Sequence, residues 1–109
     1  MKPREKEITM AYCTFPNKAV AEEISLLLVR EGIVACANIF PPHTAIYSWQ
    51  NQIQKDEECA ALFKMNSRKR TALTERIRAT HPYQTPALVF WTADGGAPEF
   101  LNWVYDQSL

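Results

Sequence analysis

The stretch 32–65 constrains the fold of this chain most strongly, because it predicts one long β-hairpin. Its first arm, 33–49, is rich in apolar and aromatic residues and is interrupted by Pro41 and Pro42. Proline has no backbone N–H to donate, so it is confined to the edges of sheets and to bulges. We therefore expect the first arm to kink at this pair and to continue along a sheet edge.

A turn at 50–52 leads from the first arm into the return arm, 53–65. Asn51 is the turn residue best able to take a positive φ. The return arm is polar over 54–58 and apolar towards its end. The hairpin is therefore expected to extend beyond the core of the domain.

The other elements surround this hairpin in the chain. Apolar residues predict strands at 8–15 and 87–92, and helical spacing predicts helices at 18–31, 68–80 and 99–105. The order β-α-β-β-α-β is that of the split βαβ plan. The predicted class is α+β, a ferredoxin-like βαββαβ sandwich with an extended β-hairpin and a short C-terminal helix.

One domain, 8–109, is expected after a charged N-terminal tail, 1–7. Right-handed crossovers place the strand 8–15 between the return arm and the strand 87–92, with two helices on one face. The strands 8–15 and 87–92 are apolar on both faces, whereas a sheet face that meets water usually alternates with polar residues. We therefore predict a homo-oligomer whose uncovered sheet faces pack inward.

Composition excludes several classes of partner. Twelve basic and twelve acidic residues give a formal net charge of zero, which argues against a nucleic-acid partner. No apolar run is long enough for a membrane span, so no membrane partner is expected. The chain has an odd number of cysteines, which fits reduced thiols in the cytoplasm: Cys13, Cys36 and Cys59.

Cys13 and His81 form the first candidate site. Strand 8–15 runs antiparallel to strand 87–92, so Cys13 should lie near the residues that precede the latter. A thiolate and an imidazole suit copper or zinc. The alternative is that Cys13 belongs to the core and His81 ends a helix, because two ligands do not complete a tetrahedral site.

A second candidate site runs along the hairpin, where aromatic and charged side chains could line an inter-subunit cleft. Its residues are Tyr47, Trp49, Glu57, Glu58 and Lys64. The alternative is simple cross-strand pairing on a solvated surface. No nucleophile, base and orienting group stand together, and no glycine-rich phosphate loop is present, so an enzyme is not expected.

An ordered series of short motifs resembles a known family. They are Cys36-Ala37-Asn38-Ile39, Ile46-Tyr47-Ser48-Trp49-Gln50, Glu58, Lys64, His81-Pro82-Tyr83, Pro86 and Leu101-Asn102-Trp103. Together they resemble the CutA family of divalent-cation tolerance proteins, from about residue 8 to the C-terminus. Each motif alone is weak evidence for this family, but the whole series in this order is specific to it.

The resemblance implies a homotrimer, similar in design to PII proteins, that acts in tolerance to divalent metals, notably copper. It also implies that Cys13 and His81 bind a copper ion. The alternative function is a PII-like signalling adaptor with a small ligand in the cleft at Tyr47, Trp49 and Lys64.

The chain departs from the family pattern at several positions. Thr80 stands where some relatives carry a second histidine, which removes a ligand. Asn51 and Gln52 replace the usual Gly-Lys of the turn, and Met65 replaces a frequent threonine.

Overall fold

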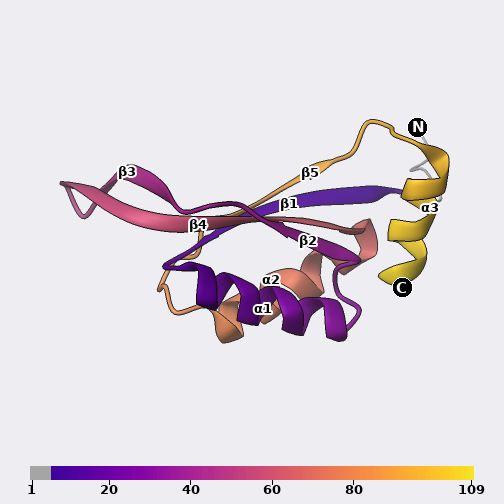
Figure 1. Ribbon diagram of the computed structural model, residues 1–109, viewed down its shortest axis with the longest axis horizontal. Helices are drawn as coiled ribbons and strands as arrows, with labels where there is room; N and C mark the ends of the chain where they lie inside the picture. Colours follow the sequence, from indigo (N-terminus) through magenta and orange to yellow (C-terminus); the bar gives the residue numbers. More distant parts are fainter. Residues whose placement is uncertain (1–5) are drawn as a thin grey trace.

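The structure, a computed structural model, describes residues 6–109 as a five-stranded sheet with three α-helices (Figure 1). Most of the predicted tail 1–7 lies outside the described residues. The strands are β1 (Ile8–Phe15), β2 (Cys36–Ile39), β3 (His43–Trp49), β4 (Gln52–Asn66) and β5 (Leu88–Thr92). The helices are α1 (Lys18–Arg30), α2 (Arg70–Thr80) and α3 (Pro98–Gln107), and a 3₁₀ turn, η1 (Ser67–Lys69), precedes α2. The α+β class is confirmed.

β1 lies at the centre of the sheet, as predicted. The strand order is β2-β4-β1-β5, and β3 pairs with β4 outside this path. All pairings are antiparallel. Cys13 lies opposite Ala61 on one side and Leu88 on the other. The end of β1 is thus next to the start of β5, which brings the segment after α2 close to Cys13.

The hairpin is interrupted where the two prolines predict it. β2 and β3 both pair with β4, and the break between them contains Pro41 and Pro42. The turn is shorter than expected, because only Gln50 (φ 50°) and Asn51 (φ 65°) separate the paired strands. Two positive φ angles in a two-residue loop match the twist of a tight hairpin. Figure 1 shows the end of the hairpin projecting beyond the rest of the sheet.

Local signals in the sequence mark both ends of α1 and the start of η1. The side chain of Asn17 accepts a hydrogen bond from the backbone N–H of Val20, at 2.9 Å, and so caps α1. Gly32 follows the same helix with φ +70°, which favours glycine. Asn66 accepts from the N–H of Arg68 and opens η1.

The core lies between the sheet and helices α1 and α2, which Figure 1 shows on the same side of the sheet. Alternate residues of β1 and β4 point to this side, because successive side chains of a strand face opposite ways. Its largest fully buried side chains are Phe15, Phe63, Leu28, Met65, Leu73 and Ile77. These residues hold the two helices on one face only.

The opposite face of the sheet carries apolar side chains that α1 and α2 do not cover, since Figure 1 shows both helices on the other side. α3 covers one end of this face, where Val104 packs against Ile8. Met10 lies opposite Trp91, and Tyr12 lies opposite Val89, so all four share this face. Val89 is 55% exposed and Trp91 46%. We call this surface the open sheet face. It has the apolar character from which an oligomer was predicted.

Candidate functional site

His81 ends α2 and links three parts of the chain. Its backbone N–H donates to Ile77, and its ring stacks on Phe15 with 4.9 Å between ring centroids. Nε2 lies 2.7 Å from the carbonyl oxygen of Thr14, and Nδ1 accepts from the backbone N–H of Tyr83 at 3.1 Å. Because Nδ1 accepts, the proton of a neutral ring is on Nε2, which donates to Thr14. Both ring nitrogens are therefore engaged.

Cys13 lies beside His81, as the predicted topology required. Its side chain is fully buried, and Sγ donates to the same Thr14 carbonyl at 3.7 Å. Burial raises the pKa of the thiol to about 12, and the negative charge of Glu58 adds to this effect. The thiol is thus protonated at neutral pH, whereas a metal ligand would be a thiolate.

Copper binding here would break at least one hydrogen bond of the His81 ring and release the proton of the Cys13 thiol. Within residues 6–109, no group of three or more histidine, cysteine, aspartate or glutamate side chains could hold a metal ion. The role of Cys13 and His81 as metal ligands stays a prediction.

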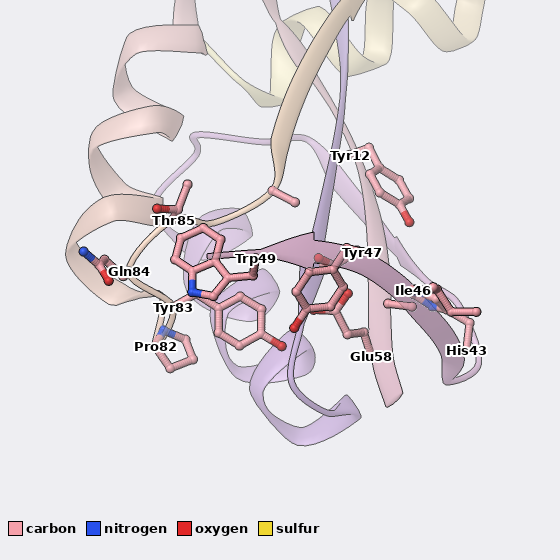
Figure 2. Close-up of a pocket in the computed structure, with 13 residues that line it drawn as sticks. Tyr12, His43, Ile46, Tyr47, Trp49, Glu58, Pro82, Tyr83, Gln84 and Thr85 are labelled. Atoms are coloured by element: carbon pink, nitrogen blue, oxygen red, sulfur yellow. The ribbon is translucent and has the colours of Figure 1, made fainter. Parts of the chain in front are cut away.

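A pocket of about 660 Å³ lies next to this pair, between the hairpin, β1 and the segment that follows His81 (Figure 2). Tyr12 and Thr14, from β1, form part of its wall. Its other side chains include His43, Tyr47, Trp49, Glu58 and Tyr83.

The strand alternation explains why the hairpin gives several side chains to this pocket. His43, Tyr47 and Trp49 are at odd positions of β3, so they share one face. Across the ladder, His43 lies opposite Glu58. Figure 2 shows the rings of Tyr47 and Trp49 close to that of Tyr83.

Two pairs of phenol and carboxylate groups mark the site. The hydroxyl of Tyr47 donates to the carboxylate of Asp56, and this hydrogen bond is the main cause that raises the pKa of Tyr47. Burial raises the pKa of Tyr83, and a hydrogen bond to Glu58 raises it further. Both phenols are therefore neutral donors at physiological pH.

The structure brings together three of the five predicted cleft residues. Tyr47, Trp49 and Glu58 line the pocket, but Glu57 and Lys64 do not. Lys64 has other partners. Its ammonium group donates to the side chain of Asn38 and lies 5.7 Å from the ring centroid of Phe100. Glu58 and Lys64 share a strand face, as predicted, but they are six positions apart on β4, or roughly 20 Å.

Three residues of the site were not among the predicted site residues. Tyr83 appears in the sequence analysis only within a family motif. The position of His43 directly after Pro41 and Pro42 favours an exposed loop residue. In the structure, His43 begins β3 and is half-buried in the pocket. Asp56 was missed, although its two-residue spacing from Glu58 on a predicted strand indicates a shared face.

The buried ring of His81 should make the folded protein less stable in mild acid. Burial lowers its pKa in the folded protein. The unfolded chain therefore binds a proton at a higher pH, and the free energy of unfolding should fall as the pH drops below about 6.5. Urea unfolding between pH 8 and pH 5 measures this.

The variant His81→Leu should have a shallower pH slope over this range. His43→Gln is the matched control, because it removes the other histidine. Equal slopes for the wild type and His81→Leu would contradict the assignment.

An α+β chain with this sheet, one covered face and a projecting hairpin can be compared with known proteins. A family model described as CutA1 divalent ion tolerance protein matches residues 9–107. Divalent-cation tolerance protein CutA from Thermotoga maritima is 36% identical over 100 residues, which are 92% of this chain and 98% of that protein. The chain belongs to the CutA1 divalent ion tolerance family, as its motifs predicted.

The solved structures agree with this membership. CutA1 from Ehrlichia chaffeensis has a TM-score of 0.90 and 34% identity, and the match covers 97% of this chain and 99% of that one. The similar Protein CutA homolog from Xenopus laevis is 37% identical over 99 residues. This chain covers only 66% of the Xenopus protein and 55% of Protein CutA from Mus musculus.

The family is named for ion tolerance and not for a reaction. Among the described residues, no helix combines the length and apolar character needed to cross a membrane. A relative from Archaeoglobus fulgidus is described as a periplasmic divalent cation tolerance protein.

Proposed function

We propose that this chain acts as a homotrimer in tolerance to divalent cations, copper among them. The observation that carries the assembly is the open sheet face. On this face, Met10 pairs with Trp91 and Tyr12 pairs with Val89 across β1 and the edge strand β5, and Val89 and Trp91 are exposed. Surfaces of this kind usually mark an interface, because leaving them in water is unfavourable.

The hairpin supplies the second part of the proposed assembly. β3 pairs only with β4, so its other edge has free backbone donors and acceptors among the described residues. A neighbouring subunit can add a strand to such an edge. Ile46 and Ile53, which are 69% and 76% exposed, lie on the projecting part of the hairpin and would be covered by the neighbour.

Cys13 and His81 remain the proposed copper ligands on the family resemblance alone. The geometry offers an independent, structural role for both residues, because each contacts the Thr14 carbonyl. We also propose a cytoplasmic location, which the three free thiols Cys13, Cys36 and Cys59 support.

An anaerobic competition titration with Cu(I), Cu(II) and Zn(II) tests the copper proposal, on protein whose mass in solution is known. The wild type is compared with a Cys13→Ser, His81→Ala double variant. Stoichiometric binding that the double variant loses would support the pair. The variant Cys36→Ser is the matched control, because Cys36 is half-buried and lies on another strand.

Weak binding, or binding that the double variant keeps, would contradict a copper centre at Cys13 and His81. Circular dichroism of each variant separates the loss of a ligand from the loss of the fold.

A further inference from the structure

We propose that the pocket between the hairpin and Tyr83 binds an organic cation that carries a quaternary ammonium group. This inference does not rest on the proposed role in metal tolerance. It follows from the charge, the aromatic walls and the size of the pocket.

The charged groups of the pocket favour a cation. Glu58 lines it, Asp56 holds the hydroxyl of Tyr47, and the described lining contains neither lysine nor arginine. Glu58 is 9% exposed, so water screens its charge poorly. The local field is therefore negative, although the whole chain has no formal net charge.

Aromatic rings form much of the wall. Tyr12, Tyr47, Trp49 and Tyr83 all line the pocket, and Figure 2 shows the last three gathered on one side of it. The face of an aromatic ring attracts a cation, most strongly when the ring is tryptophan. Such walls suit an alkylated ammonium group, which is held without hydrogen bonds from its nitrogen.

The arrangement suits a bulky cation better than a metal ion. The volume of about 660 Å³ lies within the range of small-molecule sites. The phenol of Tyr47 already donates to the carboxylate of Asp56, and Glu58 lies close enough to the phenol of Tyr83 to raise its pKa. No set of three metal-ligating side chains occurs in the part of the chain that the structure describes. A quaternary ammonium ion needs charge and ring faces but no set of ligand atoms.

Calorimetric titration of the intact protein with choline tests this inference. The comparison ligand is 3,3-dimethylbutan-1-ol, which has the shape of choline with carbon in place of the charged nitrogen. Choline should bind at least about tenfold more tightly than the alcohol, because only choline gains from the carboxylates and the ring faces. Equal affinities would overturn the proposal.

Two variants locate the binding. Trp49→Leu and Glu58→Gln should each weaken choline binding by about tenfold. Trp103→Leu is the matched control, because Trp103 is 44% exposed, close to the 42% of Trp49, but lies in α3 outside the pocket. Its affinity for choline should equal that of the wild type.

Three results would overturn the assignment. The first is that Trp49→Leu and Glu58→Gln, shown to be folded by circular dichroism, keep the wild-type affinity. The second is that the intact oligomer binds no choline, as expected if a neighbouring subunit fills the pocket. The third is that Zn(II) displaces choline when present at equal concentration.

Discussion

Replacing Phe15 with alanine is expected to lower the free energy of unfolding by about 3–5 kcal/mol. Phe15 is fully buried, and its ring is among the largest side chains of the core. Its removal leaves a cavity between β1 and the helices and removes the surface on which the His81 ring stacks. Because His81 holds the backbone of Tyr83, the pocket should loosen as well.

Urea unfolding at a fixed protein concentration measures the loss, since an oligomer gains stability with concentration. The matched control is Phe40→Ala, because Phe40 is 43% exposed and its removal creates no buried cavity. The control should cost far less than the core variant. Similar losses for the two variants would show that Phe15 is not a central packing residue.

Replacing Trp91 with glutamate is expected to convert the proposed homotrimer into monomers. Trp91 lies on the open sheet face, opposite Met10. In a symmetric assembly the change places one carboxylate from each subunit into an apolar interface. Burying these like charges should weaken association by on the order of 100-fold or more.

Sedimentation equilibrium of the wild type and the variant measures this effect. The wild type should have the mass of three chains. Leu26→Glu is the control, because Leu26 is 50% exposed in α1, on the helical side of the sheet. That variant should remain trimeric, and a trimeric Trp91→Glu would contradict the assembly through the open sheet face.

The two phenols of the pocket meet carboxylates on one face of β4, Tyr47 at Asp56 and Tyr83 at Glu58. The candidate site therefore forms only when the hairpin is folded. Tyr47 comes from β3, whereas Tyr83 follows α2, and they approach each other only across the tertiary structure. The sequence predicted the hairpin half of the site, at Tyr47, Trp49 and Glu58. It did not predict Tyr83 as a site residue, because the loop that carries it has no periodic pattern.

Local patterns in the sequence determined the elements of this protein. Pro41 and Pro42 divide the first arm of the hairpin because they lack an N–H. Gly32 ends α1 because glycine readily takes the positive φ, here +70°, that a helix end often needs. Apolar residues at both odd and even positions of β1 predicted its two apolar faces, of which α1 and α2 cover one. These outcomes depend on the conformational limits and polarity of neighbouring residues, so they can be read without a structure.

Only the tertiary structure decided which polar groups meet. Lys64 shares a strand face with Glu58, yet its ammonium group is bound to Asn38. His81 and Cys13 do come together, but hydrogen bonds to the Thr14 carbonyl occupy the atoms a metal would need. The physical reason is that hydrogen bonds between distant segments depend on ångström-scale separations set by packing. The order of residues fixes which face a side chain points to, but not the partner that it meets there.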